Sequence, residues 1–351
     1  MAMTTQRLPY IDALKGVAIM LVTIGHSFIG SNPFPPNAPY NLMIFIYSVH
    51  MPLFLFISGY VFNFDKYSNR FSLFGKSRFA SLIFPYTYLY ISSIPIMFLL
   101  SGYLPGKYSV QAYTSDFLSL LPQYYAWLWF LPILFLTEIF YFILLSITRN
   151  HNILLLILVV GVGAISVYNR LPNDPPWFAM RLAGIALLFY YTGNITRGRL
   201  SFDFMQSLAI IGFCSSIFLV FGGLSFIGIN NVIDNHNHLT WIKYSIIAVC
   251  GILSIYLSIK NIYEHGIKSN LLEFLGRNCI IIYLLQGWAV AFVGRVNGNL
   301  FPPIIDGKHV FAITCLILLF TIPCVFMINY FTRFKRIKGW STTQVFRPYR
   351  R

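Results

Sequence analysis

Residues 12–27 read "DALKGVAIMLVTIGHS", a mostly apolar stretch that is typical of a helix crossing a lipid bilayer, yet it contains three ionisable side chains. An α-helix turns about 100° per residue, so Lys15 and His26 lie on one face of this helix and Asp12 borders that face. The rise from Lys15 to His26 is about 16 Å. Because ionisable groups are costly inside a membrane, this polar face predicts a functional path through the bilayer.

Two structural explanations compete with that prediction. Lys15 can extend its ammonium to the lipid headgroups, with Asp12 paired beside it. His26 can be a structural histidine in a polar contact between helices. A buried, neutral imidazole with a free ring nitrogen is, however, also a general base, or a nucleophile that carries an acyl group. We expect His26 to act in one of these two ways, and the sequence does not choose between them.

The whole chain has the composition of a membrane protein. Of its 351 residues, 57% are hydrophobic and 10% are charged, whereas a soluble domain has about 25% charged residues. Apolar runs of about 18 or more residues recur, and in lipid such runs must form helices. We therefore predict an all-α, polytopic integral membrane protein with about ten transmembrane helices. The expected spans are residues 12–30, 42–62, 80–101, 125–148, 152–169, 179–196, 205–223, 240–260, 271–293 and 309–331.

The distribution of charge predicts the orientation of these helices. Eighteen of the 25 Lys and Arg residues fall in segments that lie inside if the N-terminus is cytoplasmic, and five fall in the outer segments. Because positively charged loops stay in the cytoplasm, we predict that both termini are cytoplasmic. We expect no cleavable signal peptide, since polar groups interrupt the first apolar run and no small-residue cleavage site follows it.

The chain is predicted to form one transmembrane domain, residues 1–331, followed by a basic cytoplasmic tail, residues 332–351. The tail holds seven basic and no acidic residues, which is a pattern that anionic membrane lipid attracts. The net charge is +15, but its concentration beside a membrane helix argues against nucleic-acid binding. The five cysteines show no CxxC spacing, so we expect free, apolar thiols. "NHNH" at 235–238 lies in a loop with one carboxylate, and we expect no metal site.

A second histidine opens the next apolar segment. His50 lies at the outer end of "SVHMPLFLFISGYVF", residues 48–62, so His26 and His50 are expected to converge near the outer leaflet. His50 is alternatively an interfacial anchor. Ser58 and Gly59 lie deeper, where small residues permit close helix approach. We also expect these small side chains to leave space for an acyl group beside the polar face of the first helix.

Two cations precede the third apolar segment. Lys76 and Arg78 occur in "GKSRFASLIFPY", residues 75–86, at the end of the helix that is expected to face the cytoplasm. They suit a polyanionic cytosolic ligand, since arginine binds phosphate through two parallel hydrogen bonds. The positive-inside rule alone also explains them.

Five stretches carry a resemblance to a known family: "YIDALKGVAIMLVTIGHS" at 10–27, "HMPLFLFISGY" at 50–60, "RFASLIFPY" at 78–86, "WFLPILFLTEI" at 129–139 and "FLGRNCIIIYLLQ" at 274–286. Together they resemble acyltransferase family 3 of integral membrane proteins, close to its fucose 4-O-acetylase and O-antigen O-acetylase branch. The likeness covers nearly the whole chain. It implies ten helices, an acyl-CoA donor (usually acetyl-CoA) taken from the cytoplasm, and a hydroxyl acceptor on an envelope polysaccharide or lipid-linked glycan. It also implies a multi-pass protein of the bacterial inner (plasma) membrane.

The resemblance assigns roles to individual residues. Lys15 and His26 match the family's basic residue and histidine in the first helix, and we expect these two residues and His50 to be catalytic. Arg78 matches the first member of an arginine pair. We expect Lys15, Lys76 and Arg78 to bind acetyl-CoA.

Two positions depart from the family's pattern. Ser81 stands where the second arginine of the pair is expected, so Lys76 is expected to replace it in binding the donor. Gln286 stands where the family has a histidine, and we assign it no catalytic role.

A transporter or flippase for a polar lipid or small anion is the alternative function. Such proteins show related halves or paired broken helices, whereas the polar residues here gather in the first 90 positions. The enzyme is therefore favoured. A scaffold subunit is a third class, which leaves His26 unexplained. The expected partners are acyl-CoA, the glycan acceptor and anionic lipid; self-association into a homo-oligomer stays open.

Overall fold

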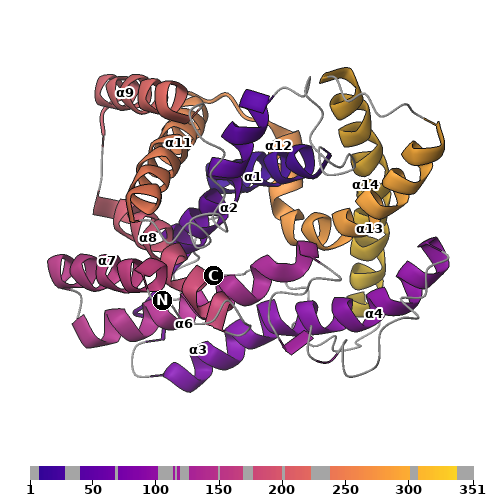
Figure 1. Ribbon diagram of the computed structural model, residues 1–351, viewed down its shortest axis with the longest axis horizontal. Helices are drawn as coiled ribbons and strands as arrows, with labels where there is room; N and C mark the ends of the chain where they lie inside the picture. The colour runs from indigo at the N-terminus through magenta and orange to yellow at the C-terminus, as the bar shows by residue number, and fades with distance from the viewer. Residues whose placement is uncertain are drawn as a thin grey trace. The chain divides into compact units, whose positions relative to one another are not determined.

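Every regular element in the described part of the chain is a helix, so the predicted all-α class is confirmed. Figure 1 shows the computed structural model. It describes residues 8–27, 40–67, 70–101, 114, 117–118, 126–148, 151–168, 177–199, 202–222, 238–300 and 307–337. The helices are α1 (Pro9–Ser27), α2 (Tyr40–Val61), α3 (Phe71–Arg78), η1 (Phe79–Ile83), α4 (Phe84–Ser101), η2 (Ala126–Trp129), α6 (Phe130–Thr148), α7 (Asn152–Tyr168), α8 (Trp177–Arg199), α9 (Phe204–Gly222), α11 (His238–Glu264), α12 (Asn270–Arg277), α13 (Cys279–Leu300) and α14 (Gly307–Ile337).

Each of the ten predicted spans overlaps at least one helix in the described part of the chain. Among the described residues, three helices are long and apolar enough to cross a membrane: Phe130–Thr148, Thr240–Glu264 and Phe311–Tyr330. Shorter apolar helices cover Phe45–Val61, Asn152–Val167, Phe204–Ile217 and Cys279–Val290. The number of crossings and the cytoplasmic position of both termini stay predictions. Residues 338–351 of the predicted tail lie outside the described residues.

Large apolar side chains are exposed along several of these helices. On α14, Phe311, Leu319 and Phe326 are exposed, whereas Ile317 and Val325 are completely buried. On α7, Ile153 is 78% exposed while Val159 is buried. Soluble proteins rarely expose apolar surface on this scale. Helices that are apolar on both their buried and their exposed sides fit a lipid environment.

Two of the expected spans differ in detail from the sequence prediction. The predicted span 271–293 is divided into two helices, α12 and α13, which are separated at Asn278. The predicted span 80–101 begins earlier, at Phe71, and contains the π-helical turn Phe79–Ile83. Pro85 lacks the N–H that would bond to the carbonyl of Ser81. The widened turn pairs the backbone N–H of Phe84 with the carbonyl of Phe79 instead.

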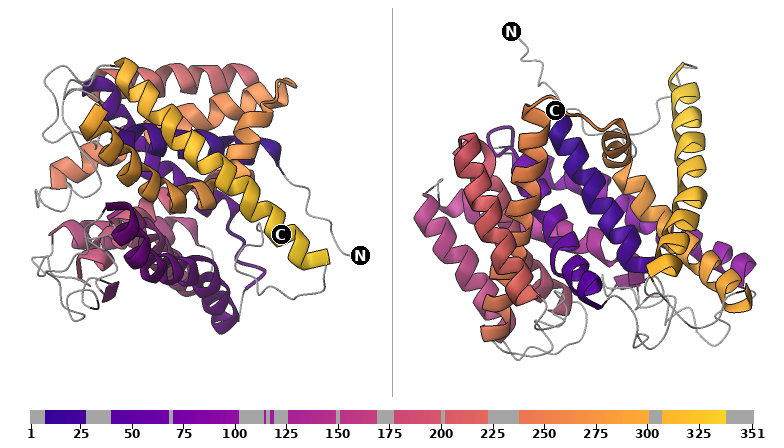
Figure 2. Two further views of the ribbon diagram at one scale, coloured as in Figure 1. Left: turned by 90° about the vertical axis from the view of Figure 1, so that its right-hand side faces the viewer. Right: turned by 90° about the horizontal axis from the view of Figure 1, so that it is seen from above.

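The described helices fall into two compact units, and each unit is considered by itself. The first comprises residues 1–40, 203–212 and 253–351. In it, α1 packs against α12, α13 and α14, and α13 packs against α14 (Figure 2). The contact of α1 with α12 is made by backbones: a Cβ at Gly276 would overlap the carbonyl oxygen of Asp12, and one at Gly16 would overlap that of Leu272. Glycine at both positions is what permits this approach.

The second unit comprises residues 41–202 and 213–252, with α6, α7 and α8 in mutual contact. Here α2 and α8 also approach through glycines, because a Cβ at Gly59 would overlap the carbonyl oxygen of Tyr190, and one at Gly193 that of Phe56. Gly59 therefore permits close packing of α2 on α8, which is the first of the two roles that the sequence predicted for it. The expectation that Gly59 lines open space is wrong, since the backbone of α8 occupies that side.

We predict that Gly276→Ala destabilises the protein. The added methyl group must push apart the backbones of α1 and α12, and overpacking of this kind costs about 1–3 kcal/mol. Gly212→Ala is the matched control, because nothing lies within 4 Å of a Cβ there, and alanine in an open helix stabilises by about 0.5–1 kcal/mol relative to glycine. Thermal unfolding in detergent compares the two variants. Equal melting temperatures would show that the α1–α12 contact is not tight.

Candidate functional site

Lys15 and His26 lie on one continuous helix, α1. Their shared face and their rise of about 16 Å follow from helix geometry. Lys15 is partly exposed, and its ammonium has no ion-pair or hydrogen-bond partner among the residues that the structure describes. Cys279, at the start of α13, lies close enough to Lys15 and Asp12 to feel their charges. The ammonium thus lies near the junction of α12 and α13, available to an anion.

The backbone determines which ring nitrogen of His26 carries the proton. Nδ1 lies 2.8 Å from the carbonyl oxygen of Val22, one turn earlier on α1. A carbonyl oxygen only accepts, so Nδ1–H is the donor, and a neutral ring keeps its lone pair on Nε2. Within the described residues, Nε2 has no hydrogen-bond partner, and the side chain is partly exposed. The ring is therefore arranged to accept a proton or to attack an electrophile at Nε2.

A polar seam runs between α1, α13 and α14 beside His26, formed by Thr23, Ser27, Gln286 and Thr314. The Ser27 hydroxyl donates to the carbonyl of Thr23 at 2.9 Å or to the Thr314 hydroxyl, also at 2.9 Å. The Thr23 hydroxyl donates to the carbonyl of Ile19 at 2.9 Å and lies 3.5 Å from Oε1 of Gln286. Gln286 is completely buried. Sequence reasoning did not identify this seam, because its members come from helices far apart in the chain.

His50 repeats the backbone arrangement of His26. Its Nδ1 donates to the carbonyl of Ile46 at 2.6 Å, and its ring meets Tyr47 edge to face with the centroids 5.1 Å apart. The side chain is buried. His50 belongs to the second unit and His26 to the first, so the predicted convergence of these two histidines stays a prediction.

Lys76 and Arg78, the two predicted donor-binding residues of α3, point in different directions. Lys76 is exposed, whereas Arg78 is buried. Nε of Arg78 lies 3.2 Å from Oε2 of Glu138 on α6, and its guanidinium covers the ring of Phe74 at 5.3 Å. Glu138 is the partner that the sequence did not identify. The ion pair of Arg78 thus links α3 to α6. Lys76 is the exposed cation of the two.

Several cations of the second unit lie close to the end of α2. Lys66, Arg70 and Lys76 are exposed there among the described residues, beside the exposed Asp65. Nη1 of Arg197 donates to the carbonyl of Phe62 at 2.7 Å. His50 lies 12 residues before Phe62, or about 18 Å along the helix. The second unit therefore has a basic end and a histidine well removed from it.

The pKa of Tyr67 shows the effect of the positive charges at this basic end. Burial raises the pKa of its phenol, but a hydrogen bond with Ser77 and the positive charges of Arg78 and Lys66 outweigh burial and hold that pKa below its ordinary value. Nζ of Lys66 lies over the Tyr67 ring at 5.1 Å. Groups that favour a phenolate also favour the phosphates of a nucleotide-containing ligand.

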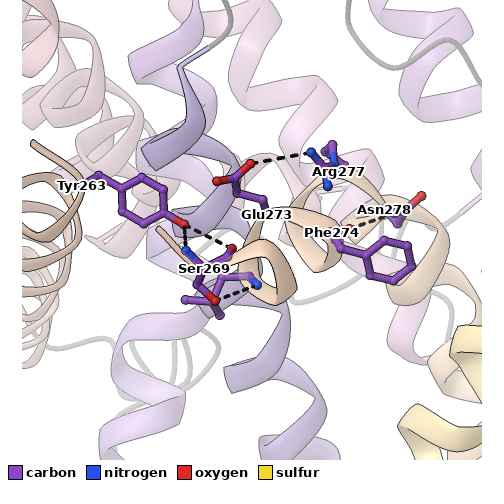
Figure 3. A network of polar contacts seen from close by, with 7 residues as sticks. Tyr263, Ser269, Glu273, Phe274, Arg277 and Asn278 are labelled. Carbon is purple, nitrogen blue, oxygen red and sulfur yellow. Dashed lines mark hydrogen bonds and ion pairs between the residues drawn. The ribbon is translucent and has the colours of Figure 1, made fainter. Parts of the chain in front are cut away.

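Two further arginines have structural partners. Arg181, which is 2% exposed, donates from Nε to the carbonyl of Ser166 at 2.8 Å, and so satisfies the end of α7. Nη1 of Arg277 lies 3.6 Å from Oε2 of Glu273 (Figure 3). In the same region, the Tyr263 hydroxyl accepts from the N–H of Ser269 at 3.0 Å, and Ser269 caps α12.

No group of three or more His, Cys, Asp or Glu side chains is placed to hold a metal ion in the described part of the chain. Residues 235–237 of the "NHNH" segment lie outside that part. The five cysteines are free thiols, and Cys214 and Cys250 are buried.

We predict that Glu138→Gln destabilises the protein strongly. Removing one partner of a buried ion pair leaves the other charge uncompensated, at a cost of about 3–5 kcal/mol. Replacing both partners, with Arg78→Met and Glu138→Leu, should recover most of this loss. Glu264→Gln, in the surface pair of Lys260 and Glu264 at 3.7 Å, serves as control and should change the free energy of unfolding by less than about 1 kcal/mol. If Glu138→Gln is as mild as Glu264→Gln, the buried pair does not hold α3 on α6.

The profile of a family described as an acyltransferase domain matches residues 8–330. Searches of curated proteins and of solved structures found no match.

Proposed function

Because the chain belongs to acyltransferase family 3, we propose that it is a membrane O-acyltransferase. In this proposal it moves an acyl group, specifically acetyl, from cytoplasmic acetyl-CoA to a hydroxyl of an envelope polysaccharide or lipid-linked glycan. Ten helices cross the bacterial inner membrane, and both termini are cytoplasmic. Acetyl-CoA is the donor substrate, and no metal takes part.

The observation that carries this proposal is the hydrogen bond from Nδ1 of His26 to the carbonyl of Val22. It leaves Nε2 unprotonated in the neutral ring, on the helix face that also bears Lys15. A base with a fixed tautomer and a free lone pair is what hydroxyl acylation requires. A transporter can use such a histidine as a proton relay, so it is the match to the acyltransferase family that favours the enzyme.

The chemistry at His26 can follow two routes. In the first, Nε2 takes the proton of the acceptor hydroxyl while its oxygen attacks the thioester carbonyl; the C–S bond breaks, and the thiolate of coenzyme A takes the proton from the imidazolium. In the second, Nε2 itself attacks the thioester and coenzyme A leaves as thiolate. The acyl-imidazole then passes its acyl group to the hydroxyl, whose proton goes to the thiolate. Both routes use the same nitrogen.

Lys15, Lys76 and Arg78 are proposed to bind the donor, as the sequence predicts. Coenzyme A is a polyanion, and Lys15 and Lys76 are cations without a partner among the described residues. Arg78 contributes its positive charge from a buried position beside Glu138. His50 is proposed to act on the opposite side, where the glycan is expected, as a second polar residue for the acceptor.

We predict that His26→Ala lowers the rate of acetyl transfer by about 10²–10⁴, because a catalytic base or nucleophile is lost. Stability should change little. His265→Ala is the matched control: its Nδ1 makes the same bond to a carbonyl one turn earlier, that of Asn261, at 2.8 Å. Transfer of labelled acetyl from acetyl-CoA to glycan extracted from the host envelope measures the rate. A His26→Ala variant that keeps more than about a tenth of the rate has lost no base or nucleophile.

We predict that Lys76→Glu weakens acetyl-CoA binding about two- to tenfold, since an exposed charge contact contributes up to about 1 kcal/mol and reversal adds repulsion. The difference should shrink as salt is raised. Lys76 is a sharper probe than Arg78, because substituting Arg78 also breaks its pair with Glu138. Lys243→Glu, at an exposed lysine expected on the outer side, is the control. Calorimetry that finds equal affinities for both variants would refute the placement of the donor.

A further inference from the structure

Gln286 of α13 is a completely buried amide, and its Nε2 has no hydrogen-bond partner in the part of the chain that the structure describes. Buried amide groups are nearly always paired, because an unpaired donor loses its hydrogen bonds to water without replacement. A buried donor without a partner requires an explanation, such as an ordered water or a bound ligand that accepts its hydrogen bond.

The contact that this amide makes with the described residues does not satisfy it. Oε1 of Gln286 lies 3.5 Å from the Thr23 hydroxyl, but Thr23 gives its single hydrogen to the carbonyl of Ile19 at 2.9 Å. A hydroxyl has only one hydrogen to donate, so the contact with Oε1 is weak. The amide therefore gains little from the described residues around it.

The position of Gln286 links this amide to His26. Thr23 and His26 are three residues apart on α1, a spacing that brings their Cβ atoms to about 5–6 Å. Gln286 contacts Thr23 from α13, and Ser27 meets Thr314 of α14 one turn further on. Gln286 thus belongs to the polar seam and contacts α1 at Thr23, one turn before His26, within one helical unit.

We propose that the Nε2–H of Gln286 donates a hydrogen bond to the acyl carbonyl oxygen of the donor during transfer. The inference rests on the proposed O-acyl transfer. As the nucleophile attacks the carbonyl carbon, the π electrons move to the oxygen, which becomes an oxyanion. Gln286 stabilises this charge. When the carbonyl re-forms, the C–S bond breaks, and the proton that His26 took from the hydroxyl goes to the coenzyme A thiolate. Gln286 gains and loses no proton.

The amide is suited to this task because it is buried and its Nε2 has no partner among the described residues. A donor in a dry site acts more strongly on a developing charge than one in water, and it needs no reorganisation during the reaction. A glutamine chosen for stability would instead have partners on both ends of its amide. An Nε2–H that no described residue accepts is a donor available to the substrate.

The test replaces Gln286 by methionine, which has a similar length and shape but no donor. We expect kcat for acetyl transfer to fall about 10²–10³-fold, the usual loss on removing one oxyanion donor, with KM for acetyl-CoA changed less than about threefold. The melting temperature should stay the same or rise, because an apolar chain of the same shape removes an unpaired buried group. A structural glutamine would lower the melting temperature when replaced. A lower kcat with an unchanged melting temperature therefore indicates a catalytic role.

Asn261→Leu is the matched control. Asn261 is also buried, and its Nδ2 likewise lacks a partner among the described residues, but it lies on α11, three residues before the helix ends at Glu264. Its substitution should leave kcat within about threefold of the wild type. Equal rates for Gln286→Met and the wild type would overturn the proposal and leave an ordered water as the partner of Nε2. Equal losses in Gln286→Met and Asn261→Leu would also overturn it.

The wild type and His26→Ala are measured in the same assay. Absence of acetyl transfer by the wild type would contradict the proposed function itself, and with it this inference. Transfer that depends on His26 but not on Gln286 would contradict this inference alone. A fall in the melting temperature of Gln286→Met together with its rate would show that Gln286 is structural.

Discussion

A polar side chain among apolar helices costs about 1–3 kcal/mol unless its hydrogen bonds are satisfied, and this chain meets most of that requirement within single helices. Hydroxyl groups on α1, α6, α7 and α8 donate to the carbonyl four residues earlier, as seen for Thr23, Ser27, Thr137, Ser146, Ser166, Thr192 and Thr196. The same local bond holds His26 and His50. In a neutral histidine, however, this bond uses only Nδ1–H, so Nε2 keeps its lone pair. Nε2 can then accept a proton or act as a nucleophile.

Side chains that cannot be satisfied locally determine how the helices assemble. The guanidinium of Arg181 reaches the end of α7, and that of Arg78 reaches Glu138 on α6. The amide of Asn278 donates to Phe274 and accepts from Asn329 of α14 at 2.9 Å, so the interruption between α12 and α13 is itself bonded to a neighbouring helix. Each of these contacts satisfies a charge or an amide and links two elements.

Gln286 is one of the buried side chains that the described residues leave unsatisfied, and it contacts the helix that carries His26. A buried amide with one weak contact lowers stability, so its value must lie elsewhere. Within the first unit it lies beside Thr23, one turn from His26. A base with its lone pair free and a donor without an acceptor are the two complementary groups that acyl transfer to a hydroxyl uses. The exposed cations, in turn, suit a polyanionic donor such as coenzyme A, in keeping with the proposed function.

The sequence by itself determined the helices and the face of α1 that carries Lys15 and His26. Apolar length and helical periodicity are properties of a single segment, so each of the ten predicted spans overlaps at least one helix in the described part of the chain. Only the tertiary structure decided what lies opposite each face. It placed Arg78 against Glu138 instead of in the open, packed Gly59 on the backbone of α8, interrupted the span at Asn278, and left Gln286 unpaired. Periodicity says which residues share one side of a helix, but the partner on that side comes from a helix that can lie more than two hundred residues away in the chain, as Gln286 does from Thr23.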